Sequence, residues 1–199
     1  MVSAMILAAG ESSRMGSPKA LLKIGQKTFL QYIADVLVSA RVLDIVVVLG
    51  ADASEIQKNL GWFRGKILIN EDWQKGQLSS ILVGLRAVEQ KDLHGILICP
   101  VDCPLITQHL IVKMLHQFWT RHKPIVVPVY KGRRGHPVLI GRAFLAELER
   151  APIEIGVRAV LWNHPDDVLE YQTEDDGVLT NIDTPEDYQG KIVKRFSSS

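Results

Sequence analysis

A loop bounded by two glycines follows the first apolar segment of the chain and leads to two cations. The apolar segment spans residues 3–8, the glycines are Gly10 and Gly16, and the cations are Arg14 and Lys19. Small residues let the backbone approach a ligand, so that main-chain N–H groups can point at phosphate oxygens. The cations can neutralise charge that the amides leave. The pattern suits a polyanion, although an ordinary glycine-rich connection with surface cations has the same composition.

Two well-known phosphate-binding loops do not match this segment. The P-loop has a Gly, four further residues and then Gly-Lys-Ser/Thr, but Met15 takes the place of the second glycine and Gly16 is followed by Ser17. The dinucleotide fingerprint has its second glycine two residues after the first, where this chain has Ser12. The loop is therefore of a third kind.

A carboxylate follows an apolar segment in the middle of the chain. Asp102 comes after residues 95–99, which we expect to form a buried strand, and it lies between Pro100 and Pro104. It can cap the local turn through its own carboxylate. It can also serve as a hard oxygen ligand for Mg²⁺ beside phosphate oxygens.

A second carboxylate, Asp183, lies near the end of the chain. A Thr-Pro pair that starts a helix explains residues 184–187 but requires neither Asn181 nor Asp183. We expect residues 178–182 to form a strand, so that Asp183 lies at a strand end as Asp102 does. Two strand-end carboxylates could then converge on one cation.

Small residues mark the start of a helix that we expect to reach about residue 90. Gly76, Ser79 and Ser80 lie there, close to the edge at which open α/β sheets bind ligands. A capping role explains one serine but explains neither Gly76 nor Gly84. We therefore favour a ligand-binding role for this segment.

Cations cluster around the sequence Gly135-His136-Pro137-Val138. We interpret Lys131 and Arg133 as a solvated hairpin tip, whereas His136 either binds an anion or fixes the loop. Arg158 lies in the first turn of a further helix, where the helix dipole disfavours a cation. An anionic ligand would account for Arg158, and so would a distant salt bridge.

Helical and strand-like segments alternate along the chain, which predicts a parallel sheet covered by helices on both faces. Helical periodicity marks residues 28–40, 52–60, 81–90, 108–120, 142–150 and a segment from 156. Apolar runs of strand length mark residues 3–8, 44–49, 66–70, 95–99, 124–129, 168–173 and 178–182.

Composition narrows the class of protein. At 199 residues the chain is expected to form a single domain, with residues 194–199 as a frayed tail. A net charge of +1 predicts no nucleic-acid partner. No apolar run approaches the roughly 18 residues of a membrane span, and no basic region precedes the first apolar segment, so we expect neither a membrane anchor nor a signal peptide. The two cysteines, Cys99 and Cys103, suit buried packing in a reducing cytoplasm.

The segment from Leu7 to Lys19 resembles the signature loop of the MobA-like NTP transferases, which belong to the nucleotide-diphospho-sugar transferase superfamily. Gly135-His136-Pro137-Val138 and the segment 181–188 are similar to the branch that transfers cytidylyl or guanylyl groups to the molybdenum cofactor, and the chain as a whole most resembles the cytidylyltransferases of that branch. The resemblance runs in the right order from Leu7 to Tyr188. It implies a three-layer, Rossmann-like α/β sandwich with a mixed, mostly parallel sheet. It also implies transfer of a nucleotidyl group from an NTP to a phosphorylated acceptor, with release of pyrophosphate.

The resemblance also assigns roles to residues. Arg14 and Lys19 would stabilise the transition state and the leaving pyrophosphate. Mg²⁺ would be held by Asp102 and Asp183, with Asn181 as the alternative second ligand. His136 and Arg158 would contact the acceptor. The nucleotide would be bound by Leu7, Ala8, Ala9, Gly10, Ser12, Ser13, Gly76, Ser80 and Pro100, with Gly84 completing a Gly-Ser-Gly pattern.

The resemblance further suggests the substrates. Ala9 stands where the guanylyl-transferring branch tends to have Gly, which points to CTP. The acceptor would then be molybdopterin or a related cofactor phosphate, and a molybdoenzyme could receive the product. Two alternatives stay open at this point. One is a nucleotidyltransferase for a sugar or alcohol phosphate, and the other is a non-catalytic nucleotide or cofactor carrier.

Overall fold

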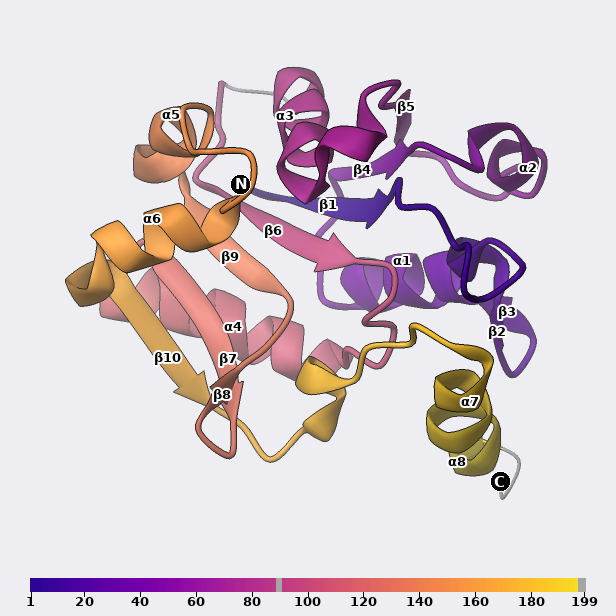
Figure 1. Cartoon of the computed structure of the whole chain (residues 1–199). Coiled ribbons are helices and arrows are strands. Elements are labelled where there is room, and N and C mark those ends of the chain that lie inside the picture. Colours follow the sequence, from indigo (N-terminus) through magenta and orange to yellow (C-terminus); the bar gives the residue numbers. More distant parts are fainter. Residues whose placement is uncertain (89–90, 197–199) are drawn as a thin grey trace.

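The computed structural model describes residues 1–88 and 91–196 and is built on an eight-stranded sheet (Figure 1). Its strand order is β10-β7-β9-β6-β1-β4-β5, and β8 pairs with β7. The strands are β1 Val2–Ala8, β4 Ile45–Leu49, β5 Lys66–Ile69, β6 Gly95–Pro100, β7 Ile125–Tyr130, β8 Arg133–Arg134, β9 Val138–Gly141 and β10 Val168–Gln172. A separate small pair joins β2 Lys23–Ile24 to β3 Lys27–Thr28.

Most of the sheet is parallel. β1 pairs in parallel with both β4 and β6, β4 with β5, and β10 with β7. β9 runs antiparallel to both of its neighbours, β6 and β7. The expected mixed, mostly parallel sheet is confirmed.

Helices cover both faces of the sheet. The α-helices are α1 Phe29–Ser39, α2 Ala53–Lys58, α3 Gln77–Ala87, α4 Gln108–Arg121, α5 Leu145–Leu148, α6 Val157–Asn163, α7 Pro185–Asp187 and α8 Lys194–Phe196. Short 3₁₀ turns are η1 Lys19–Leu21, η2 Trp73–Lys75, η3 Arg142–Phe144, η4 Pro165–Asp167 and η5 Asp176–Leu179, and η6 Tyr188–Val193 is a π-helix.

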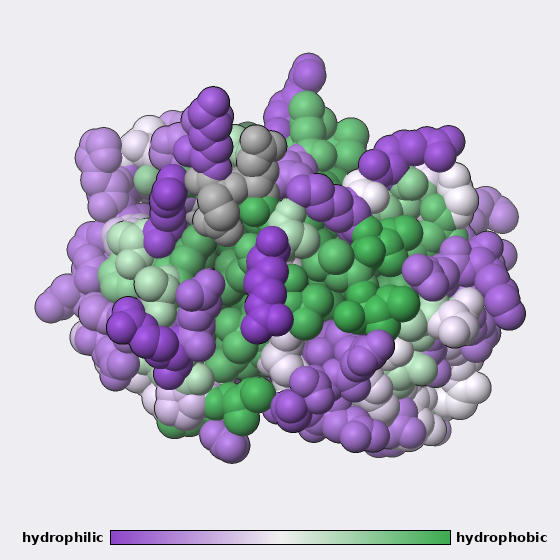
Figure 2. Space-filling model, turned by 90° about the horizontal axis from the view of Figure 1, so that it is seen from above, coloured by the Kyte–Doolittle hydropathy of each residue, from purple (hydrophilic) through white to green (hydrophobic). Residues whose placement is uncertain are grey.

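Alternation along β1 divides the core into two clusters. Ala4, Ile6 and Ala8 pack with α1 and α4 on one face. Met5 and Leu7 pack with α3, α5 and α6 on the other. The face seen from above carries hydrophobic residues in its middle and hydrophilic ones around them (Figure 2). No helix in residues 1–88 and 91–196 is long and apolar enough to cross a membrane.

The parallel pairing of β4, β1 and β6 brings three loops to one edge of the sheet. All five residues of β4 are buried, as expected for an interior parallel strand. Gly50 follows β4, and a Cβ atom there would lie 2.3 Å from the carbonyl oxygen of Ala9. A glycine is therefore required where the β4 loop passes the glycine-bounded loop.

The structure corrects several expected elements. Residues 178–182 do not form a strand: η5 ends at Leu179 and an irregular segment follows. Ile182 is nevertheless fully buried, because its side chain packs into the core cluster on the α1–α4 face of the sheet. Its backbone pairs with no strand. The helix expected over residues 142–150 is the turn η3 followed by the four-residue α5. α3 ends at Ala87, and Gln90 lies outside the described residues.

The structure also contains short strands that the sequence did not predict, and its C-terminal tail is partly helical. Strands β8 and β9 and the β2–β3 pair, each of two to four residues, were not expected from the sequence. The expected frayed tail begins with the short helix α8, and residues 197–199 lie outside the described residues.

Candidate active site

A cavity of about 320 Å³ opens at the carboxyl ends of β1 and β6. It contains most of the residues that the sequence assigned to the nucleotide and its catalysis. These are Leu7, Ala8, Ala9, Gly10, Ser12, Lys19, Gly76, Ser80, Pro100 and Asp102.

Four of the predicted residues do not line this cavity, and one of them is Asp183, whose place is described below. Ser13 is exposed on the loop. The side chain of Arg14 is 68% exposed and reaches Asp183 instead. Gly84 is buried in α3, where a Cβ atom would lie 2.3 Å from Cε of Met5, so this glycine allows the helix to pack closely on β1. Close packing on Met5 thus accounts for a glycine at position 84 without a contact to the base.

Other residues of the cavity were missed by sequence reasoning. They are Glu11, Ala20, Asp52, Ile56, Trp73, Gln74, Gln77 and Val101. Asp52 could have been found, because it follows β4, the parallel neighbour of β1. Trp73 and Gln74 could also have been found, because they directly precede the glycine that was singled out.

Ser12 holds the loop in shape. Its hydroxyl accepts a hydrogen bond of 3.0 Å from the backbone N–H of Lys19. Its carbonyl oxygen accepts from the N–H groups of Met15, at 2.9 Å, and Gly16, at 3.2 Å. Gly16 has a φ of +68°, which only glycine adopts readily. The loop thus folds back on itself and fixes the start of η1, from which Lys19 projects.

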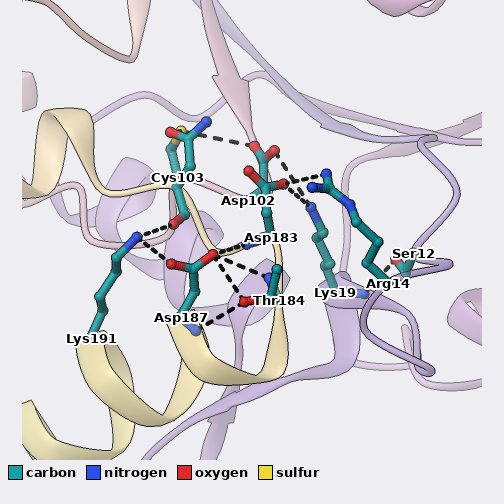
Figure 3. Close-up of polar contacts among 10 residues, drawn as sticks. Ser12, Arg14, Lys19, Asp102, Cys103, Asp183, Thr184, Asp187 and Lys191 are labelled. Atoms are coloured by element: carbon teal, nitrogen blue, oxygen red, sulfur yellow. Dashed lines mark hydrogen bonds and ion pairs between the residues drawn. The ribbon is translucent and has the colours of Figure 1, made fainter.

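Lys19 brings the two predicted carboxylates together (Figure 3). Its Nζ lies 2.6 Å from Oδ1 of Asp183 and 3.8 Å from Oδ2 of Asp102. Arg14 approaches Asp183 from the exposed side, with Nη2 at 3.5 Å from Oδ1. The Lys19 side chain is only 14% exposed, so its charge is poorly hydrated and depends on these partners.

The first turn of helix α7 fixes the backbone of Asp183. It does not lie at a strand end, as expected, but on the irregular segment that leads into α7. The Asp187 carboxylate accepts hydrogen bonds from the N–H groups of Asp183, at 3.1 Å, and Thr184, at 3.2 Å, which completes a capping box. The Nζ of Lys191 lies 2.6 Å from Asp187. The hydrogen bond from Lys191, followed by that from the Asp183 backbone, lowers the pKa of Asp187.

Two contacts join the Asp183 segment to the Asp102 loop. The N–H of Ile182 donates to the carbonyl oxygen of Asp102 at 2.8 Å. The thiol of Cys103 donates to Oδ1 of Asn181 at 3.0 Å. The amide of Asn181 is therefore engaged by the thiol, and Asp183 is the residue of this segment that faces Lys19. Burial raises the pKa of Cys103 and of Cys99, so both thiols stay protonated as packing groups.

A second cavity, of about 530 Å³, adjoins the first and shares Gly76 and Gln77 with it. It is lined by both residues assigned to the acceptor, His136 and Arg158. Nδ1 of His136 is buried and has no hydrogen-bond partner within the described residues. Burial lowers the pKa of His136, and Arg158 lowers it further while Asp102 opposes the shift.

The cationic hairpin beside this cavity is as expected at its tip. Lys131 and Arg133 are exposed, on a β7–β8 hairpin. Arg134 lines the cavity, and its Nε donates to Glu170 of β10 at 2.7 Å. The peptide bond between His136 and Pro137 is cis.

A family comparison agrees with this geometry. The sequence model of the MobA-like NTP transferase domain matches residues 4–168. The chain belongs to this family. Among curated relatives of the MobA-like chain, the molybdenum cofactor cytidylyltransferase of Escherichia coli is 27% identical over 94% of this chain and 93% of its own length. The molybdenum cofactor guanylyltransferase of Shewanella pealeana is 26% identical over 94% and 92%.

A third relative of the MobA-like chain carries a different kind of name. The nicotine blue oxidoreductase of Paenarthrobacter nicotinovorans is 29% identical over 93% of both chains. Solved structures share the fold. Rv0371c of Mycobacterium tuberculosis superposes with a TM-score of 0.85 at 24% identity, covering 96% of this chain and 97% of that one. A nucleotidyl transferase from Methanothermobacter superposes with a TM-score of 0.83 at 21% identity, covering 100% and 99%.

The donor set of this MobA-like site fits a divalent cation that is shared with a substrate. Asp102 and Asp183 already face one cationic group, the ammonium of Lys19. Within residues 1–88 and 91–196 no group of three or more His, Cys, Asp or Glu side chains could hold a metal. Mg²⁺ is characteristically bound by one or two carboxylates together with phosphate oxygens and water. Asp102 and Asp183 could supply the two carboxylates, because they lie beside a loop whose small residues suit phosphate binding.

Proposed function

We propose that this chain is a Mg²⁺-dependent nucleotidyltransferase that couples CTP to molybdopterin or a related cofactor phosphate and releases pyrophosphate. The observation that carries the proposal is the meeting of Lys19, Asp102 and Asp183 beside the glycine-bounded loop. A half-buried cation, two carboxylates and a small-residue loop suit an enzyme that handles a triphosphate with Mg²⁺. A binding protein without catalysis does not require the carboxylates.

In the proposed reaction an acceptor phosphate oxygen attacks the α-phosphorus of the nucleotide. The bond from that phosphorus to the bridging oxygen breaks, and pyrophosphate leaves. Both reactants are anions, so positioning and charge stabilisation would supply most of the rate. Lys19 and Arg14 would neutralise charge on the phosphates. Mg²⁺ held by Asp102 and Asp183 would supply further positive charge at the α-phosphate.

Each substrate has a cavity in this proposal. The first cavity would hold the nucleotide, since the loop residues 7–12 and the start of α3 line it. The second would hold the acceptor, with Arg158 for an anionic group and His136 for a polar one. Because the cavities share Gly76 and Gln77, an acceptor phosphate could reach the α-phosphate without either substrate leaving its site. The preference for CTP rests on Ala9, and a molybdoenzyme would receive the product.

The test is pyrophosphate release from each of the four NTPs with Mg²⁺, with and without a molybdopterin-containing acceptor. We expect release with CTP only when the acceptor is present. Asp102→Asn should abolish most of this release, whereas Asp35→Asn should not, because Asp35 pairs with Lys27 at the surface.

Other outcomes point elsewhere. NTP binding without release would move the search to sugar or alcohol phosphates as acceptors, and failure of these as well would favour a carrier. A chain that binds no NTP would contradict the proposal. The chemistry named for the Paenarthrobacter relative, an oxidoreduction, would then be the next activity to assay.

A further inference from the structure

A buried asparagine lies behind the wall of the first cavity. Asn70 directly follows β5 and is 2% exposed. Its Nδ2 donates to Oγ of Ser79 at 2.8 Å and to Oγ of Ser80 at 3.0 Å. Ser80 lines the cavity, whereas Asn70 and Ser79 do not. A change at Asn70 can therefore reach a ligand only through Ser80 or through the fold.

The orientation of the Asn70 amide is fixed by the backbone. The N–H of Asp72 donates to Oδ1 of Asn70 at 3.0 Å. A backbone N–H can only donate, so the atom that it meets must be the amide oxygen. Both hydrogens of Nδ2 are then directed at the two serines.

The two serine hydroxyls differ in whether the structure provides an acceptor for their own hydrogen. The Ser79 hydroxyl donates its hydrogen to the carbonyl oxygen of Gly76, at 2.7 Å, or of Asp72, at 3.1 Å. The Ser80 hydroxyl accepts from Asn70. No acceptor for its own hydrogen is found among the residues that the structure describes. Ser80 therefore has a spare hydrogen-bond donor, and it is a residue that lines the cavity.

We propose that Asn70 is a positioning residue for nucleotide selection, because it fixes the Ser80 hydroxyl as a donor toward the base. This inference rests on the proposed function, in which the first cavity holds the nucleotide. A base that presents an acceptor there, such as O2 of a pyrimidine, completes the hydrogen bond. A base that presents a donor leaves two donors facing each other in a buried wall, which is costly.

The test inverts this polarity without changing the shape of the side chain. In Asn70→Asp an ionised carboxylate still accepts from the N–H of Asp72 but cannot donate to Ser80. The Ser80 hydroxyl then turns its hydrogen toward the carboxylate and presents a lone pair to the base. We expect the ratio of the dissociation constant for CTP to that for GTP to change by about tenfold or more. Calorimetric titration of the four nucleotides, without acceptor, measures the dissociation constants.

Two variants separate selection from stability. Ser79→Ala removes one hydrogen bond of the same network behind the wall, so it should lower the Tm and leave the nucleotide ratios unchanged. Asn70→Ala frees the Ser80 hydroxyl to donate or accept, so it should weaken the preference without inverting it. In Asn70→Asp, acid pH should restore part of the original ratio, because a protonated carboxyl can donate to Ser80 again.

An equal loss of affinity for all four nucleotides would overturn the inference. If Asn70→Asp and Asn70→Ala weaken all four nucleotides by one common factor, as a purely structural residue would, then Asn70 does not direct Ser80. This result differs from failure of the proposed function, in which the unmodified chain would bind none of the four nucleotides.

Discussion

At the scale of single residues, Lys19 lies between the two carboxylates that are proposed to hold Mg²⁺. Its ammonium lies between Asp183, at 2.6 Å, and Asp102, at 3.8 Å. We expect Lys19→Met to lower the turnover on the order of a hundredfold or more, because the variant lacks the charge that is proposed to stabilise the transition state. The same variant should bind Mn²⁺ more tightly without nucleotide, because the competing cation is gone.

Electron paramagnetic resonance of free Mn²⁺ would measure that affinity. Lys27→Met is a matched control, because it also breaks a lysine–aspartate pair of 2.6 Å, but at the surface. Weaker Mn²⁺ binding in Lys19→Met would show that the lysine supports the carboxylates instead of competing for them.

The buried His136 should make the stability of the fold depend on pH. Burial lowers the pKa of His136 in the folded chain, whereas an unfolded chain has a histidine pKa of about 6.5. The unfolded state therefore binds the proton more readily, and stability is lost as the pH falls through about 6.5 toward the folded pKa. His136→Gln should show a smaller drop in Tm between pH 7.5 and pH 5.5. His109→Gln, an exposed change on α4, should keep the full drop.

At the scale of elements, the short helix α7 positions a carboxylate. Asp187 caps α7 and holds the backbone of Asp183. Asp187→Ala should destabilise the fold by about 1 kcal/mol, as loss of a helix cap does, which corresponds to a Tm lower by about 2–4 °C. It should also raise the Mg²⁺ concentration for half-maximal turnover severalfold. Glu186→Ala changes a neighbouring exposed residue of the same helix and should alter neither.

How well elements follow from sequence depends on whether they are locally encoded. β4 is a run of β-branched residues, and α1 begins at a Thr28 cap, so both were predicted closely. The antiparallel β9 is four residues long and exists because β6 and β7 lie on either side of it. Residues 178–182 have the composition of a strand but pair with none. Such features are decided by tertiary neighbours, which local propensity does not contain.

In the candidate site, too, some residues are locally encoded and others are positioned by tertiary neighbours. The loop from Leu7 to Lys19 and Asp102 could be found because each lies next to a strand end. Asp183 lies beside Lys19, near Asp102, but the strand expected to position it is absent and a helix cap holds it instead. The link from Asn70 to Ser80 joins two segments through side chains, and no spacing in the sequence predicts the direction of its hydrogen bonds.

At the scale of the whole molecule, the site is assembled from both ends of the chain. The family match ends at residue 168, yet Asp183 lies beyond it. The C-terminal segment returns to the core through Ile182 and Ile192, which are 0% and 1% exposed and belong to the cluster that contains Ala4, Ile6 and Ala8 of β1. Parting the C-terminal segment from the core should therefore separate Asp183 from Asp102.

This assembly predicts how ligands stabilise the molecule. CTP at about a hundred times its dissociation constant should add about 2.7 kcal/mol, or about 5–10 °C in Tm for a chain of this size. Mg²⁺ should enlarge the shift, because in the proposed function Asp102 and Asp183 bind it together with the phosphates. Asp183→Asn should keep the shift caused by CTP alone and lose the increment caused by Mg²⁺. Differential scanning calorimetry with CTP, with Mg²⁺ and with both would measure these shifts, and an equal shift with and without Mg²⁺ in the unmodified chain would mean that the carboxylates serve Lys19 and not a metal.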